Sequence, residues 1–213
     1  MRTALVLLVL AGMTAGLTAQ TLRPALGTSV VLARVRSEMP AGTDQFTGTT
    51  LGGEGGLSFG PLVLRFDYAQ GIVSPVGGTA AARDLIEGGV RIGVRPIRWL
   101  TLSGGPHARA YVFEGRSLRW VFWEVRGRTE AAFIGSAVTG YLEAWRAVSA
   151  DVNVPEAFDH ADGGEAGIVL QLSRVPLQAR LAYRIDHAVL GGGSRLETVE
   201  GVVVGLSLAR RRY

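Results

Sequence analysis

The chain has 213 residues, no cysteine and a net charge of only +4, with arginine supplying all 22 basic residues. This length predicts one domain, and the lack of cysteine excludes a disulfide-stabilised fold for an exported protein. The small positive excess is scattered along the chain, so we expect no nucleic-acid partner.

The first twenty residues are typical of a secretory signal peptide. Arg2 precedes a short apolar run, and small residues lead to a cleavage point near Ala19 or Gln20. The run is too short to favour the alternative, a retained membrane anchor. No later window reaches eighteen apolar residues, so membrane residence would have to come from strands. We predict a signal peptide at residues 1–20 and one barrel domain at residues 21–213.

The rest of the chain divides into about ten extended segments, without a helix of convincing period. Apolar and polar residues alternate with a period of two in most of these segments, which puts the two sets on opposite faces of a strand. In chain order the segments are residues 28–37, 44–58, 62–69, 84–94, 99–113, 118–128, 137–150, 165–172, 176–186 and 196–208.

The connections between these segments alternate in length. Those after the second, fourth and eighth segments have about four residues, whereas those after the first, third, seventh and ninth have about six to fourteen, as in residues 151–164. The connection at residues 129–136 does not fit this alternation. Short turns on one rim and long loops on the other are typical of bacterial outer-membrane barrels. With both chain ends at the short-turn rim, the long loops are expected to face outside the cell.

Alternation alone leaves open which face points into the barrel, since a soluble lipocalin-like barrel would turn the apolar set inward. Several segments approach the nine to eleven residues that a tilted membrane strand needs. Tyr68 and Tyr183 fall near the outer rim, and Phe59 and Trp99 near the inner one, which suits two interfacial aromatic girdles. The charged face also mixes signs within single segments, as neutralisation inside a narrow lumen would require. These observations favour a membrane barrel.

The whole mature chain resembles the small outer-membrane β-barrels of Gram-negative bacteria. A signal peptide, about ten alternating segments and a terminal strand closing in Tyr213 carry the resemblance. It implies an all-β fold, a closed up-and-down antiparallel transmembrane β-barrel of about ten strands, within a range of eight to twelve. It also implies recognition of the last strand by the barrel insertion machinery. Arg210, Arg211 and Arg212 interrupt the alternation before Tyr213 and so depart from the strict recognition signal.

Two Asp-His pairs are the first candidates for catalysis. Asp159–His160 and Asp186–His187 lie near the long-loop rim, where omptin-like outer-membrane proteases hold Asp and His pairs. Adjacent strand residues point to opposite faces, so neither pair is expected to converge in one cleft.

Other candidate sites receive no better support. Ser103 and His107 share a face but lie about 13 Å apart at ~3.3 Å per residue, too far for a serine hydrolase pair. The acidic residues Asp151, Asp159, Asp162 and Glu165 lack a calcium-loop signature. The triplet Gly191–Gly193 does not precede a helix, which predicts a flexible loop tip. We assign no catalytic, cofactor-binding or metal residues and expect no cofactor.

The most informative constellation is a set of charged residues that alternation points into the lumen. It comprises Arg65, Asp67, Glu87, Arg91, Arg109, Glu124, Arg126, Arg180, Arg184 and Asp186. The set could line an anion-conducting pore or form an ion-pair plug. Barrels of eight to ten strands have interiors about filled by side chains, which favours the plug.

The sequence therefore predicts a non-enzymatic protein of the bacterial outer membrane, structural or adhesive, with a packed charged interior and extracellular loops that bind unknown ligands. The lipid bilayer and the insertion machinery are its expected partners. Two alternatives stay open: a narrow pore or transporter for small polar solutes, and a protease or lipid-modifying enzyme at the outer rim.

Overall fold

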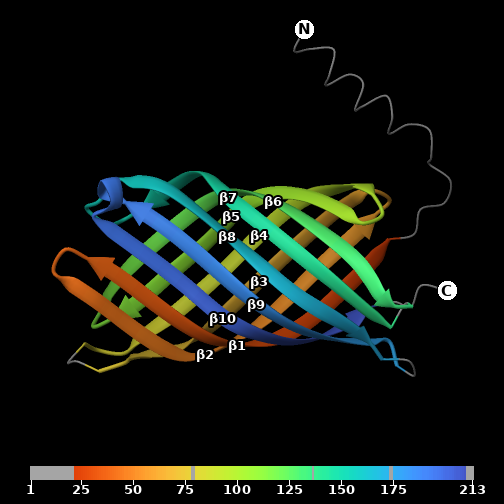
Figure 1. Cartoon of the computed structure of the whole chain (residues 1–213), viewed down its shortest axis with the longest axis horizontal. Helices are drawn as coiled ribbons and strands as arrows, with labels where there is room; N and C mark the ends of the chain where they lie inside the picture. Colours follow the sequence, from red (N-terminus) through yellow and green to blue (C-terminus); the bar gives the residue numbers. More distant parts are fainter. Residues whose placement is uncertain (1–21, 78–79, 136, 173–174, 210–213) are drawn as a thin grey trace, which may run out of the picture.

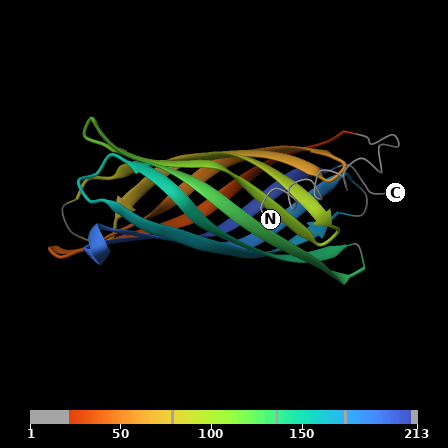
Figure 2. The ribbon, with the colours of Figure 1, turned by 90° about the horizontal axis from the view of Figure 1, so that it is seen from above.

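The computed structural model describes residues 22–77, 80–135, 137–172 and 175–209. These residues form ten antiparallel strands, in which sequence neighbours pair and β1 closes on β10 (Figures 1 and 2). The strands are β1 (Arg23–Met39), β2 (Gly42–Phe59), β3 (Leu62–Pro75), β4 (Arg83–Ile97), β5 (Leu100–Phe113), β6 (Arg116–Ile134), β7 (Val138–Val152), β8 (Phe158–Gln171), β9 (Leu177–Leu190) and β10 (Arg195–Ala209). The predicted all-β, closed up-and-down barrel is confirmed. The predicted signal peptide at residues 1–20 and the chain end at residues 210–213 lie outside the described residues.

The two rims of the barrel carry different connections between the strands. The terminal rim carries the start of β1, the end of β10 and the ends of the strands joined by the β2–β3, β4–β5, β6–β7 and β8–β9 connections. The distal rim carries the connections at residues 40–41, 76–82, 114–115, 153–157 and 191–194. A single 3-10 turn, η1 (Gly191–Gly193), forms the last of these, where a flexible loop tip is predicted.

The predicted alternation of short turns and long loops is wrong. The predicted loop at residues 151–164 contains the end of β7 and the start of β8, which leave only residues 153–157 between them. Likewise, β3 continues to Pro75 and β9 to Leu190. Outside a bilayer the outward side chains need not be apolar, so hydrophobic alternation fades while the hydrogen-bonded ladder continues.

The period of two places successive side chains outside and inside the barrel, as β9 illustrates. Leu181 and Tyr183 are 50% and 46% exposed on the outer surface, whereas Ala182 is buried between them. Asp186, two positions beyond Arg184, is buried in the lumen. The outside of this strand is apolar and its inside charged, which is the reverse of a lipocalin-like barrel.

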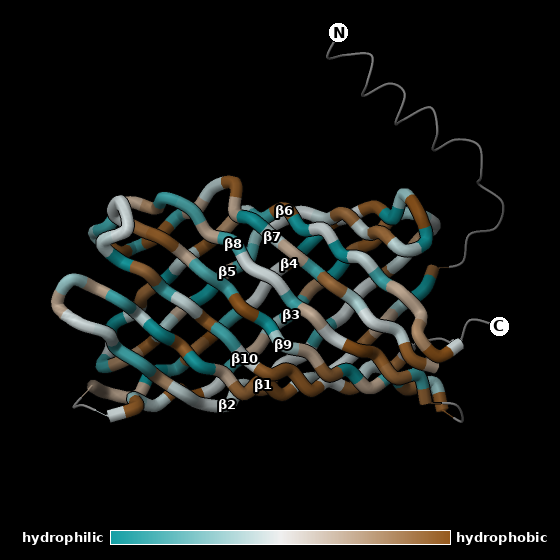
Figure 3. The backbone as a smooth tube through the Cα atoms, in the orientation of Figure 1, coloured by the Kyte–Doolittle hydropathy of each residue, from teal (hydrophilic) through white to brown (hydrophobic). Residues whose placement is uncertain are grey.

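Large apolar side chains cover the outer surface of the half of the barrel that ends at the terminal rim, where Figure 3 shows hydrophobic positions concentrated. This apolar belt includes the exposed residues Leu26, Val30, Leu51, Leu57, Leu62, Phe66, Val90, Ile92, Leu102, Val125, Leu142, Ile168, Leu170, Leu181, Val204 and Leu206. So large an apolar surface is unfavourable in water. The belt is therefore the lipid-facing surface of a transmembrane barrel.

No helix in the part of the chain that the structure describes is long and apolar enough to cross a membrane.

Polar side chains replace the belt toward the distal rim. This polar collar includes the exposed residues Arg34, Arg36, Thr47, Arg119, Arg146, Asp151 and Asp159. The strands contain 14 to 19 residues. A 15-residue strand tilted by about 45° rises about 35 Å, some 10 Å more than an apolar band of about 25 Å. The collar therefore stands outside the bilayer.

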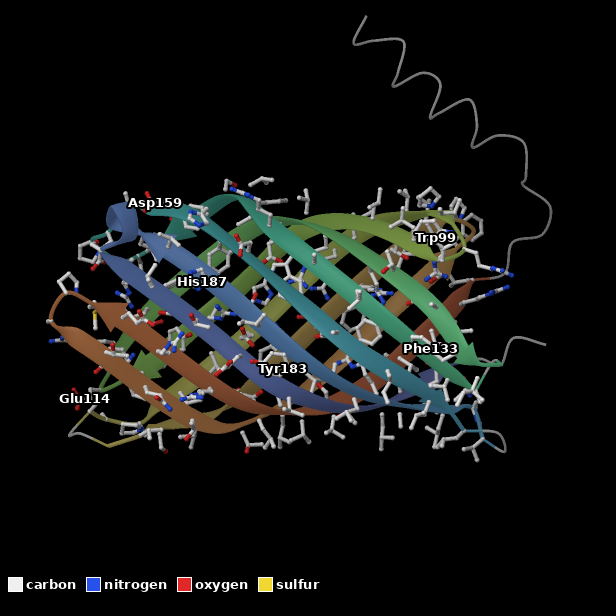
Figure 4. All side chains as sticks on the ribbon, viewed as in Figure 1. Trp99, Glu114, Phe133, Asp159, Tyr183 and His187 are labelled. Carbon is white, nitrogen blue, oxygen red and sulfur yellow. The ribbon has the colours of Figure 1, made fainter. Side chains whose placement is uncertain are left out.

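Aromatic side chains lie on the outer surface at two heights of the barrel. Trp99 and Phe133 lie at the terminal rim, whereas Tyr183 lies midway along the barrel (Figure 4). The hydroxyl of Tyr183 donates to Glu200, and that of Tyr68 donates to Gln70 at 2.8 Å. The prediction of Tyr68 and Tyr183 near the outer rim is therefore corrected, because the strands continue beyond them into the collar.

Candidate functional site in the barrel interior

The lumen contains three layers, and the layer nearest the distal rim is apolar. One buried cluster comprises Ala33, Val35, Phe46, Val73, Leu85, Tyr111 and Val199, and another comprises Trp120, Phe122, Ala147, Ala188 and Leu190. Trp120, Val73 and Leu190 are 0% exposed. We call these two clusters the apolar plug. The prediction of an interior packed with charges is therefore wrong for the distal half.

One buried carboxylate within the plug is compensated by its neighbours. Glu197 accepts a hydrogen bond from the hydroxyl of Tyr111 at 2.7 Å and another from Ser37 at 3.4 Å. Arg195 lies 3.6 Å from the same carboxylate, with its guanidinium over the ring of Trp120. A buried carboxylate is tolerated when it is paired and hydrogen-bonded, so Glu197 links the plug to the barrel wall.

An ion-pair layer crosses the middle of the lumen. Arg109 on β5 donates to Glu87 on β4 at 2.7 Å and to Asp186 on β9 at 3.1 Å. Arg184 donates to the same Asp186 at 2.7 Å and lies 3.4 Å from Glu87. The indole of Trp145 on β7 donates to the other oxygen of Asp186 at 2.7 Å. These contacts join strands from opposite walls, as the predicted ion-pair plug requires.

A second group of ion pairs follows β6 and β7. Arg126 contacts Glu124 at 2.6 Å and Glu143 at 3.2 Å, and Arg128 contacts Glu130 at 2.8 Å and Glu143 at 3.4 Å. Glu130 and Glu143 are absent from the predicted lumen set. Glu143 shares its parity with Tyr141 and Trp145, and this shared parity is the signal that could have assigned all three to the lumen.

Two further pairs complete the charged wall. Arg180 on β9 reaches Glu54 on β2 at 3.1 Å, across β10 and β1. A Cβ atom on Gly27 would lie 3.0 Å from the carboxylate of Glu54, so glycine leaves room for this contact. Arg91 pairs with Asp67 on the neighbouring strand.

The third layer is a cavity of about 1600 Å³ between the ion pairs and the terminal rim. Residues of the terminal turns, including Gly60, Arg98 and Gly135, line its open end, and Glu87 and His107 line its inner end. We call this cavity the vestibule. Among the described residues its lining contains nine arginines and six carboxylates, a net charge of +3 with His107 neutral.

The candidate catalytic pair Asp186–His187 does not converge. The carboxylate of Asp186 lies in the lumen, whereas the ring of His187 faces outward and its Nδ1 lies 3.1 Å from the hydroxyl of Thr198 on β10. Asp159 accepts a hydrogen bond from the backbone of Gly192 at 2.7 Å. Figure 4 shows Asp159 and His187 toward the distal rim, on different strands. As predicted, adjacent residues at 186 and 187 occupy opposite faces.

The remaining candidates also lie apart from one another. His107 is buried against Phe122, with its Nε2 at 3.7 Å from Glu87. Asp151 lies 3.7 Å from the exposed Arg119. In residues 22–77, 80–135, 137–172 and 175–209, no group of three or more His, Asp or Glu side chains is arranged to hold a metal ion.

No protein-family model and no curated protein matches the chain. Among solved structures, it is similar to Neisserial surface protein A, with 10% identity over 87% of this chain and 99% of that chain and a TM-score of 0.36. It is also similar to the translocator domain of the autotransporter NalP from Neisseria meningitidis, with 11% identity, 100% and 95% coverage and a TM-score of 0.49. The Ail protein of Yersinia pestis gives 10% identity, 86% and 97% coverage and a TM-score of 0.33. The barrel's own geometry confirms the predicted fold, a closed up-and-down antiparallel barrel of ten strands among the described residues.

Proposed function

We propose that the protein is a closed, non-enzymatic β-barrel of the bacterial outer membrane, exported by a signal peptide at residues 1–20. Its role is structural or adhesive, and it presents the polar collar outside the cell. The apolar belt supports a transmembrane position, and both ends of the barrel domain at one rim support an orientation with that rim in the periplasm. The last strand then serves as the contact for the insertion machinery.

The single observation that carries this proposal is the apolar plug. Trp120, Phe46, Leu85 and Leu190 come from different strands and are all buried inside the barrel. Interiors of barrels of about this size are filled by side chains, and an apolar constriction resists wetting. The plug therefore argues against the alternative of a pore or transporter for small polar solutes.

The collar is the surface on which an adhesive role depends. Its connections have between two and seven residues, so the paired strands themselves form most of the surface that a partner would meet. Side chains of both signs lie on it, including the pair Arg36–Glu38 at 3.0 Å. A binding role for the collar requires no catalytic residues. The alternative of an enzyme at the outer rim requires an acid and a base side chain in one cleft.

Conductance across a planar lipid bilayer tests the closed lumen. Purified wild-type protein is expected to insert without stepwise current, whereas a Phe46→Ala/Trp120→Ala double variant is expected to conduct because two of the largest plug side chains are removed. Trp123→Ala, which shortens an exposed side chain on the same strand as Trp120, is the matched control and should stay silent. Stable open-channel current from wild type would contradict the proposal.

A further inference from the structure

The vestibule contains more positive charge than its carboxylates neutralise. Every acidic residue of its lining forms an ion pair with an arginine, as in Asp67 with Arg91 and Glu143 with Arg128. By contrast, Arg23, Arg65, Arg95 and Arg98 form no ion pair with any residue that the structure describes. The excess charge therefore belongs to specific side chains rather than to the lining as a whole.

Arg65 is the most constrained of these four. It stands directly opposite Arg91 in the register of β3 and β4, and like charges in directly opposed positions repel. Its side chain is partly buried in the lumen wall and makes no side-chain hydrogen bond to a described residue. The charged groups that act on it include Arg128 as well as Glu143 and Glu130. A guanidinium in such a position is stabilised when an anion accepts its hydrogen bonds.

Neighbouring arginines also line the vestibule. Arg95 follows Arg91 on the same face of β4, and its Nε donates to the hydroxyl of Thr101 at 3.3 Å. The guanidinium of Arg128 on β6 is oriented by Glu130, Glu143 and the ring of Tyr141. Arg65, Arg95 and Arg128 thus come from three strands that are held rigidly by the barrel.

We propose that Arg65, Arg95 and Arg128 form a binding site for a dissolved phosphate-bearing solute, which enters the vestibule through the terminal rim. The planar guanidinium presents a fork of donors that matches phosphate oxygens. The cavity of about 1600 Å³ exceeds the usual 300–1,000 Å³ of a small-molecule site, so the remainder of such a solute fits with bound water. The site does not depend on the closed lumen, because it lies on the terminal side of the ion pairs.

Isothermal titration calorimetry of the full barrel in a non-ionic detergent, with inorganic phosphate as the probe, tests this site. Wild type is expected to bind one phosphate saturably when sodium chloride holds the ionic strength constant. Arg65→Gln is expected to weaken binding by about tenfold or more, since it removes charged hydrogen bonds. Arg36→Gln on the outer collar should bind like wild type. Wild type without saturable binding, or Arg65→Gln with unchanged affinity, would overturn the proposal.

The stability of the protein gives a second, independent readout. Phosphate is expected to raise the urea midpoint of wild type above its value in sodium chloride of equal ionic strength, because a ligand stabilises the state that binds it. Arg65→Gln should fold at least as well as wild type without phosphate, since it relieves repulsion with Arg91. If that variant fails to fold, the urea midpoint of wild type is the test. A midpoint that is the same in phosphate and in sodium chloride would overturn the proposed site. If wild type conducts current across a bilayer and still binds phosphate, the proposal of a closed lumen is contradicted and the proposal of a phosphate site stands.

Discussion

Asp186 illustrates how single residues hold the two walls of the lumen together. It accepts hydrogen bonds from Arg109 and Trp145 and pairs with Arg184, so three strands depend on one carboxylate. The alternating pattern of β9 correctly predicts that Asp186 and Arg184 point inward. The same pattern could not predict the partners, because the pairing of opposite walls depends on barrel closure rather than on sequence neighbours.

Replacing Asp186 with Asn should be strongly destabilising. The change leaves Arg109 and Arg184 with one carboxylate fewer in a buried layer, and breaking such a pair costs about 3–5 kcal/mol. Urea unfolding in lipid vesicles, followed by tryptophan fluorescence, measures the loss. The control is Asp151→Asn, which removes an exposed partner of Arg119 and should leave the midpoint nearly unchanged. Equal losses in both variants would refute a special role for the ion-pair layer.

Parts of the charged wall could not be read from the sequence. Glu54 lies in a glycine-rich stretch whose alternation is weak, and Glu143 lies where apolar and polar residues share both faces. Their roles come from the register, which sets Glu143 opposite Arg128. Arg65 could be assigned to the lumen from its parity, but its lack of a carboxylate partner emerges only from the positions of all its neighbours.

At the scale of strands, the number of elements could be predicted and their lengths could not. Ten segments match ten strands among the described residues because the alternation is strong wherever lipid contacts one face. In the collar the outward-facing residues are polar or small, so stretches there that are rich in glycine and aspartate look like loops in the sequence. Backbone pairing with two neighbours nevertheless holds residues such as Gly163 in β8.

Close approach of β2 and β3 depends on Gly71. A Cβ atom at this position would lie 2.0 Å from the carbonyl oxygen of Thr49, so Gly71→Ala must displace backbone. We expect a loss of about 1–3 kcal/mol, as for other overpacked positions. Gly53→Ala on β2 is the control, because the nearest atom to its added Cβ is 3.9 Å away. Refolding yield, measured as the heat-modifiable band in electrophoresis, should fall only for Gly71→Ala.

On the scale of the whole molecule, the outer surface and the lumen change character together. The half near the terminal rim is apolar outside and has the charged vestibule inside, whereas the distal half is polar outside and apolar inside. Closure of part of the lumen by side chains could be predicted from strand number, whereas the vestibule, which the prediction of a packed interior missed, could not. The apolar composition of the distal plug could not be predicted from the sequence. Alternation identifies the two faces of a strand but does not say how the polarity of each face changes along the barrel axis.

The central claim, a barrel that crosses the bilayer with its terminal half, is tested most directly by one matched pair of variants. Leu181→Arg puts a charge on the apolar belt, whereas Thr47→Arg puts the same charge on the polar collar. An outward arginine costs about 2–4 kcal/mol near the bilayer midplane and about 0–1 kcal/mol near its interface. The measurement is the free energy of unfolding of both variants and wild type in lipid vesicles.

We predict that Leu181→Arg loses stability by that amount and assembles poorly, while Thr47→Arg remains close to wild type. Equal stability of the two variants, or wild-type protein that stays in solution without detergent or lipid, would contradict the membrane barrel.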